Sequence, residues 1–262
     1  MKVLSIISSG RKNGHTSKVI SLLAQEFKQI SLNNNDYVDF ETLFLVDYTI
    51  KHCKGCRACM DYGEENCPLT DDIPLIKAKI KESDAVIFAS PVYVGDINSL
   101  MKALIDRLAY VCHRQEFYDK SALILATTNA TSLKRTIRTM GAAIYSWGFK
   151  LIGAKGFKTL TSYDSLKTIQ QKHFTDISKL ARKLYLAIRN KSFHYPSVIS
   201  LATFKIQQKY RSNPEQSSSI DYTYWKKHGW TEQNRNYYID FKASFLKKLC
   251  SRILYKLLLI IF

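Results

Sequence analysis

Short apolar runs alternate along the first 190 residues with segments whose apolar side chains recur every three to four positions. The runs 3–8, 85–90, 121–127 and 149–157 and the alternating segment 37–45 are typical of strands. Helical spacing predicts helices over 16–29, 73–81, 99–109, 132–147 and 165–190. Together they predict an α/β fold: a doubly wound, five-stranded parallel sheet with helices on both faces.

Polar loops follow the first, third and fourth apolar runs. Ligands of such sheets bind beyond the carboxyl ends of the strands, so 9–17, 91–98 and 128–131 form the candidate site. The first loop has hydroxyls, cations and two glycines directly before a helix N-terminus, which suits a phosphate monoester. The same pattern also fits an ordinary capped connection. Neither G-x-G-x-x-G nor G-x-x-x-x-G-K-[ST] follows the strand, which disfavours the two common nucleotide loops.

Length and charge define a second region. The chain has 262 residues, 46% of them hydrophobic, which suits one domain of ordinary size with an extension, or two small domains. Because residues 193–262 do not continue the alternation of strands and helices, we expect a domain over 1–192 and a mostly helical extension over 193–262. The net charge is +17, and the extension alone holds 11 basic and four acidic side chains. This balance favours anionic ligands, nucleic acid or an acidic membrane surface as partners. Because Met1-Lys2 runs directly into a strand, we expect no signal peptide and a cytoplasmic protein.

Four cysteines crowd into an aperiodic segment, 52–69, which is expected to be a loop. Their pattern is C-x2-C-x2-C-x7-C, formed by Cys53, Cys56, Cys59 and Cys67. A tight C-x2-C-x2-C opening is commoner for a [4Fe-4S] cluster than for zinc, which usually pairs two C-x2-C units over a longer gap. Three alternatives stay open: a cluster, thiols without metal, and zinc.

The order and spacing of these motifs resemble a known family. The first loop reads SGRKNGHTS from Ser9, the cysteine segment ends in Asp71-Asp72, and the third strand runs into SPVYVGDIN from Ser90. Over about residues 1–190 the chain resembles the NADPH-dependent FMN reductase family of flavodoxin-like proteins. Within that family it resembles the iron-sulfur flavoprotein branch.

The resemblance implies an FMN site made by the three loops. One set would hold the FMN phosphate: Ser9, Arg11, Gly14, His15, Thr16 and Ser17. A second set would lie along the ribityl chain and flavin ring: Pro91, Val92, Tyr93, Gly95, Asp96 and Ile97. Thr128 and Asn129 would close the third side. NAD(P)H would donate the electrons, and a homodimer is expected by the same resemblance.

Two enzyme-like functions follow. The first is an FMN-dependent NAD(P)H oxidoreductase that reduces a flavin, a quinone or another small molecule. The alternative is an iron-sulfur flavoprotein electron carrier, in which the cluster relays electrons between ferredoxin and FMN. No side chain is assigned as catalytic, because hydride transfer to a flavin needs no protein nucleophile. Only the charge favours a nucleic-acid or membrane binder, and no nucleic-acid-binding motif is present, so no nucleic-acid partner is expected.

The last twenty residues predict a basic, strongly apolar helix. Its apolar residues at a spacing of four form a stripe: Phe241, Phe245, Leu249, Ile253 and Leu257. We expect this stripe to pack against the flavodoxin-like domain or a second subunit. The alternative is peripheral contact with an acidic membrane. Trp225 and Trp230 are expected to be core or interface residues.

Overall fold

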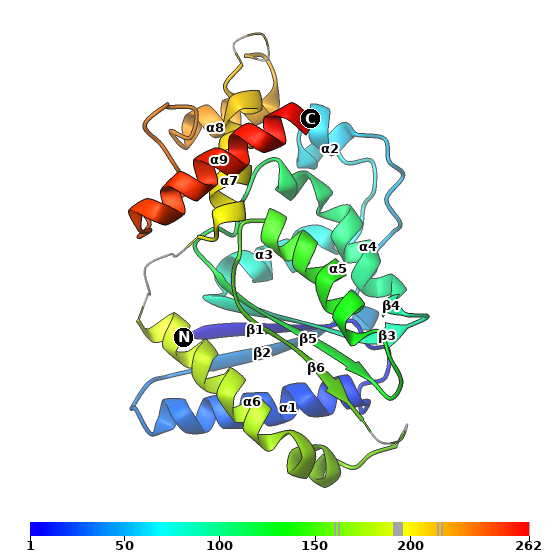
Figure 1. Cartoon of the computed structure of the whole chain (residues 1–262). Helices are drawn as coiled ribbons and strands as arrows, with labels where there is room; N and C mark the ends of the chain where they lie inside the picture. The colour runs from blue at the N-terminus through cyan, green and yellow to red at the C-terminus, as the bar shows by residue number, and fades with distance from the viewer. Residues whose placement is uncertain (160, 162, 191–195, 214, 216, 262) are drawn as a thin grey trace.

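A mixed sheet forms the centre of the molecule (Figure 1). The computed structural model describes residues 1–159, 161, 163–190, 196–213, 215 and 217–261. Five parallel strands lie in the order β2 (Asp39–Phe44), β1 (Lys2–Ile7), β3 (Ala85–Tyr93), β5 (Ser121–Thr128) and β6 (Lys150–Lys158). The short β4 (Asp96–Ile97) pairs antiparallel with β3, so the sheet has six strands and not five. A two-residue strand is too short to show a period of two, which explains the wrong count.

The strand order creates one switch point. The chain leaves β1 to form β2 on one side and then returns to form β3 on the other. The carboxyl ends of β1 and β3 therefore diverge into separate loops, and this gap is where flavodoxin-like sheets bind their ligand. The predicted doubly wound α/β fold is confirmed.

Helices cover both faces of the sheet (Figure 1). On one face lie α1 (His15–Leu32) and α6 (Leu166–Arg189); on the other lie α3 (Ile73–Glu82), α4 (Ser99–Arg107) and α5 (Leu133–Ser146). In β1, Leu4 and Ile6 point into the core under α3 to α5, while Val3 and Ile7 point into the core under α1 and α6. The central strands β1, β3 and β5 are buried on both faces and are therefore apolar without alternation, whereas the edge strands β2 and β6 keep exposed positions.

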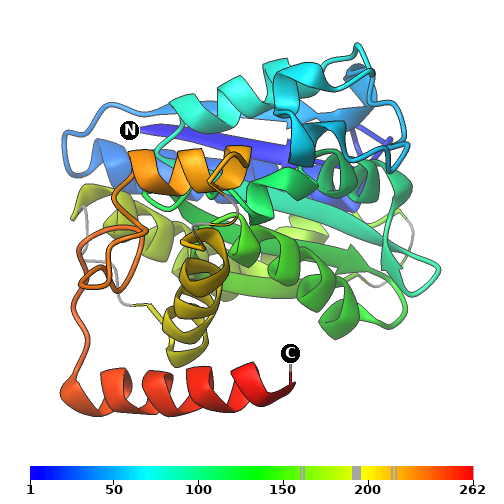
Figure 2. The ribbon, with the colours of Figure 1, turned by 90° about the horizontal axis from the view of Figure 1, so that it is seen from above.

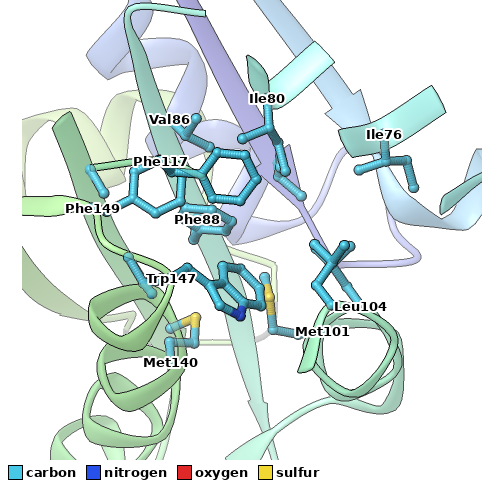
Figure 3. Packing of buried hydrophobic residues seen from close by; sticks show 14 of the residues in the cluster. Ile76, Ile80, Val86, Phe88, Met101, Leu104, Phe117, Met140, Trp147 and Phe149 are labelled. Atoms are coloured by element: carbon cyan, nitrogen blue, oxygen red, sulfur yellow. The ribbon is translucent and has the colours of Figure 1, made fainter. Parts of the chain in front are cut away.

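Aromatic side chains fill the core beneath α3 to α5 (Figure 3). The ring centroids of Phe117 and Phe149 lie 4.9 Å apart, and those of Phe88 and Phe149 lie 5.5 Å apart in a T-shaped arrangement. Trp147, at the end of α5, closes the cluster and is buried. This packing fixes α5 against β3 and so holds the loops at the strand ends in place.

The extension has its own aromatic core. It contains α7 (Val198–Arg211), α8 (Ile220–Lys227) and α9 (Phe245–Ile261), and Trp225 and Trp230 are buried in it as expected. The extension packs against the segment that follows the 3₁₀ turn η3 (Ala109–Cys112). There the Trp225 Nε1–H donates to the carbonyl oxygen of His113 over 2.8 Å. The expected boundary between 192 and 193 lies outside the described residues and stays a prediction.

The stripe on α9 does not pack against the flavodoxin-like domain, and its packing against a second subunit stays a prediction. Phe245, Leu249, Ile253 and Leu257 are between 41% and 81% exposed, so the flavodoxin-like part does not cover them. Only Phe241, ahead of the helix, packs on the extension, where its ring centroid lies 5.8 Å from that of Tyr237. Spacing alone could not reveal which face of the helix turns inward. Within the described residues, no helix is both long enough and apolar enough to cross a membrane.

Candidate functional site

The three predicted loops converge on one small cavity at the carboxyl ends of β1, β3 and β5. Its volume is about 80 Å³, the scale of an anionic group. Nine of the fourteen predicted cofactor residues line it: Ser9, Arg11, His15, Thr16, Pro91, Val92, Tyr93, Thr128 and Asn129. The other five belong to the same segments but do not line the cavity: Gly14, Ser17, Gly95, Asp96 and Ile97. The convergence follows from the parallel pairing of the strands, which brings their ends to one edge.

The first loop delivers a helix N-terminus to the cavity. A turn is closed by the Gly14 N–H, which donates to the carbonyl oxygen of Arg11 over 3.0 Å. A Cβ at Gly14 would lie 3.1 Å from that oxygen, so the turn is tight. Helix α1 begins at His15, and no side chain caps its N-terminus. Its first N–H groups and its dipole therefore remain available to an anion.

Two buried polar atoms in this loop have no hydrogen-bond partner among the described residues, His15 Nε2 and Ser17 Oγ. Buried polar groups are nearly always paired, so atoms of this kind indicate a missing ligand or water. Burial lowers the pKa of His15, and the charge of Asp164 opposes this effect. The donor set of this loop fits a phosphate group, and hence the phosphate end of FMN.

Thr127 also lines the cavity, although it is not among the residues predicted from the sequence. Its Oγ1 lies 2.8 Å from Thr16 Oγ1, and both side chains are buried. Thr127 is the penultimate residue of β5 and pairs in register with Pro91 of β3. The sequence does contain a signal for Thr127, a polar residue at the carboxyl end of an apolar strand. Such a position lies at the edge of the sheet where the candidate binding loops begin.

The second loop is a β-hairpin and not an irregular loop. Val94 and Gly95 form its two-residue turn with φ angles of +48° and +84°. A positive φ is unusual for a β-branched residue, so the turn is strained at Val94, whose side chain is fully exposed. The Asp96 carboxylate turns toward α5, where it accepts hydrogen bonds from Arg135 Nε at 3.1 Å and Thr139 Oγ1 at 3.0 Å. These bonds anchor the hairpin and leave Tyr93 half exposed beside the cavity.

Asn98 joins the first two loops. Its Nδ2 donates to the carbonyl oxygen of Ser8 over 2.5 Å, and its Oδ1 accepts from the Met101 N–H over 3.2 Å. The second bond caps α4, and the first holds the end of β1 against the hairpin. Asn98 is therefore a positioning residue for both loops.

The cysteine segment is closed at its base by two aspartates. The Asp71 side chain is buried, forms an ion pair with Arg107 and accepts the Lys51 N–H over 2.8 Å. Asp72 accepts the Thr49 N–H over 2.7 Å. Between these contacts lie the single helical turns α2 (Ala58–Asp61) and η2 (Glu64–Asn66), so the expectation of an entirely irregular loop was wrong. One helical turn is too short to leave a periodic pattern.

All four predicted metal ligands line one cavity of about 660 Å³, next to α3 and the end of α4. Arg107 Nη2 lies 3.7 Å from Cys67 Sγ. Burial, with neighbouring Cys67 and Cys53, raises the pKa of the Cys59 thiol. Among the described residues, no three His, Cys, Asp or Glu side chains converge closely enough to hold a metal ion. The chemistry of the donor set, four thiols around one cavity, nevertheless fits an iron-sulfur cluster.

The extension contacts this cysteine segment through one buried arginine. Arg114 Nη2 donates to the carbonyl oxygen of Cys59 over 2.6 Å, and its Nη1 donates to Asp221 Oδ1 of α8 over 2.6 Å. Asp221 also forms an ion pair with Arg211, and its Oδ2 lies 3.0 Å from His113 Nδ1. The Arg114 guanidinium therefore links Asp221 of the extension to the backbone carbonyl of Cys59.

Comparisons with known proteins agree with this geometry. An iron-sulfur flavoprotein of Archaeoglobus fulgidus is 28% identical over 232 residues, which cover 88% of this chain and 100% of that protein. A second iron-sulfur flavoprotein, from Clostridioides difficile, is 27% identical over 201 residues, which cover 76% of this chain and 84% of that protein. The solved structure of a flavone reductase has a TM-score of 0.55 at 14% identity, covering 75% of this chain and 72% of its own, which concerns the fold.

A solved structure of RosB, with a bound formyl derivative of riboflavin phosphate, has a TM-score of 0.54 at 13% identity. The matched region covers 94% of this chain and 92% of the RosB chain. The model of the family described as NADPH-dependent FMN reductase matches residues 1–150, more than half of the sequence. The chain therefore belongs to the NADPH-dependent FMN reductase family.

Proposed function

We propose that this flavin oxidoreductase binds FMN at the ends of β1, β3 and β5 and accepts hydride from NADH or NADPH. The observation that carries the proposal is the pair of unpartnered buried atoms, His15 Nε2 and Ser17 Oγ, beside an uncapped helix N-terminus. Membership of the FMN reductase family supports the same cofactor. The acceptor would be a flavin, a quinone, another small molecule or a redox protein.

Each loop would have a separate task. The first would bind the phosphate through backbone N–H groups, the Thr16 and Ser17 hydroxyls and the charge of Arg11. Backbone and side chains of Pro91, Val92 and Tyr93 would support the ribityl chain and ring, with Thr128 and Asn129 on the third side. Bound FMN would supply the hydride and electron transfer chemistry. The protein's part is to orient the ring and leave one face open to the nicotinamide.

Replacing Thr16 by alanine tests the phosphate loop. We expect the variant to bind FMN less tightly by about 1–2 kcal/mol, the size of one lost hydrogen bond to a charged group, or roughly five- to thirtyfold. Fluorescence titration of the apoprotein with FMN measures this change. Thr16→Ser keeps the hydroxyl near Thr127 and should bind like the unmodified protein. An FMN affinity unchanged in Thr16→Ala would contradict the assigned position of the phosphate.

NAD(P)H dependence needs its own experiment. Anaerobic mixing of the FMN-loaded protein with NADH or NADPH should bleach the flavin absorption within the time of mixing for one or both donors. Bleaching with dithionite but with neither nicotinamide would reject the proposed electron donor and leave FMN binding intact.

A second function, an electron carrier with a [4Fe-4S] cluster, is favoured by the cavity that all four cysteines share. Cys53, Cys56, Cys59 and Cys67 would hold the cluster, which would relay electrons between ferredoxin and FMN. Four irons keep their thiolates further apart than one zinc ion does, and this suits thiols spread around a large cavity. The relatives named iron-sulfur flavoprotein support the same assignment.

Protein purified without oxygen should contain iron and acid-labile sulfide in equal amounts. Its visible absorption should include a broad shoulder that dithionite bleaches. Cys56→Ser should lose this iron, whereas Cys250→Ser, at an exposed cysteine of α9, should keep it. Flavin bands without iron in the anaerobic protein would leave the reductase as the remaining function. Light scattering on the same samples tests the expected homodimer.

A further inference from the structure

Helix α9 exposes one apolar face. The helix lies beside α7 (Figure 2). Ser251 is buried on its inner face, where Leu254, Tyr255 and Leu258 are half-buried. The outer face carries apolar residues that are 41% to 82% exposed: Phe245, Leu246, Leu249, Ile253, Leu257 and Ile260. We call this set the α9 stripe. A contiguous apolar surface of this kind marks an interaction site more often than scattered exposed residues do.

Cations flank the stripe, and acids are missing from its helix. Lys248, Arg252 and Lys256 are exposed on α9, and Lys247 is half-buried. The sequence contains no aspartate or glutamate after Asp240. An apolar face bordered by lysine and arginine is the composition of helices that lie in the interface of a lipid bilayer.

The charges decide between the two occupants that the stripe could have. A second copy of the chain, packed stripe to stripe, would bring two sets of lysine and arginine together without an acidic residue from either helix. An anionic lipid surface offers the opposite charge and an apolar layer for the stripe. We propose that α9 binds peripherally to an anionic lipid membrane, with the helix lying in the plane of the interface.

This placement leaves the candidate flavin site free. The extension that carries α9 packs against the segment preceding β5, at the edge where the strands begin, while the flavin cavity lies where the strands end (Figure 1). The β3–β4 hairpin and its exposed Tyr93 are therefore not covered when α9 lies on a surface. Binding to lipid and turnover of a dissolved electron donor are compatible.

Sedimentation of the full-length protein with vesicles tests the proposal. Phosphatidylcholine vesicles containing phosphatidylglycerol should bind the protein at least about tenfold more tightly than pure phosphatidylcholine, because several cations contribute. High salt should weaken this binding. Leu249→Glu/Ile253→Glu should reduce it by about tenfold or more, since two acids would enter an apolar, anionic interface. The control Leu75→Glu/Phe174→Glu alters exposed apolar residues on α3 and α6 and should bind normally.

Equal binding to both vesicle types, or normal binding by Leu249→Glu/Ile253→Glu, would overturn the proposal. Light scattering without vesicles identifies the competing occupant. If the unmodified protein is a dimer that binds no vesicles and the α9 double variant is a monomer, a second copy covers the stripe and the proposal is wrong. Circular dichroism and flavin retention confirm that both double variants are folded.

Discussion

Asp221→Asn should lower the free energy of unfolding by about 3–5 kcal/mol, the usual cost of breaking a buried ion pair. The Asp221 carboxylate is 8% exposed, accepts a hydrogen bond from Arg114 Nη1 at 2.6 Å and forms an ion pair with Arg211 Nη1 at 3.0 Å. The Arg114 side chain is 3% exposed, so an amide at 221 leaves its buried charge with only the longer ion pair to Glu64, at 3.4 Å. Chemical denaturation followed by circular dichroism gives the change.

The pH dependence of this effect has a definite sign. Burial alone would raise the pKa of Asp221, but the hydrogen bond with His113 and the charges of Arg211 and Arg114 outweigh it and hold the pKa below its usual value. The stabilisation is therefore complete above about pH 4, the ordinary pKa of aspartate, and is lost as the pH falls through the lower folded-state pKa. The stability difference between the unmodified protein and Asp221→Asn should shrink below about pH 4.

Asp240→Asn is the matched control. The Asp240 side chain is 99% exposed, and it pairs with Arg235 in the same extension. Removing an exposed pair should change the free energy of unfolding by about 1 kcal/mol at most. Equal effects of the two substitutions would show that the Asp221 network does not hold the extension in place.

Asp71→Asn should have the second large effect, again about 3–5 kcal/mol. The Asp71 carboxylate is fully buried and pairs with Arg107, whose side chain is 4% exposed. It also accepts the backbone N–H groups of Lys51 and Ile73, and therefore closes the base of the cysteine segment. Thermal unfolding measures the global loss. The rate at which a thiol reagent modifies Cys67 measures the local opening and should rise.

The control for Asp71 lies in the same segment. Asp61 forms an exposed pair with Arg57 at 2.9 Å, so Asp61→Asn should alter neither stability nor thiol modification appreciably. Faster modification of Cys67 in Asp71→Asn without a fall in stability would mean that the aspartate holds only the segment. Unchanged stability and unchanged modification would reject its assigned role.

The fold could be predicted because the central strands β1, β3 and β5 are buried on both faces. Runs such as 85–90 and 121–127 leave few alternatives to a parallel sheet covered by helices, and the structure has both. The meeting of the three loops could also be predicted, because parallel strands bring their carboxyl ends to one edge of the sheet. Family membership then followed from the order of the motifs, which the comparison with the family model supports.

Contacts between distant segments could not be predicted. The hairpin turn needs positive φ angles at Val94 and Gly95. The usual sequence signal for such a turn is asparagine or aspartate before the glycine, and this chain has valine there. Thr127 acquires its role only because β5 pairs with β3. The link from Asp221 through Arg114 to Cys59 joins residues more than a hundred positions apart. The orientation of α9 depends equally on its packing against α7, which no local pattern encodes.

Asn98 has a consequence for how this protein could change over evolutionary time. Because one amide spans the end of β1 and the start of α4, the two loops behave as a single mechanical unit. A substitution that tilts the hairpin would also displace the carbonyl of Ser8, next to the phosphate loop. In the proposed complex, a mutation that changes how the protein binds the phosphate end of FMN would therefore also change the surroundings of the flavin ring. Selection on one property would alter the other.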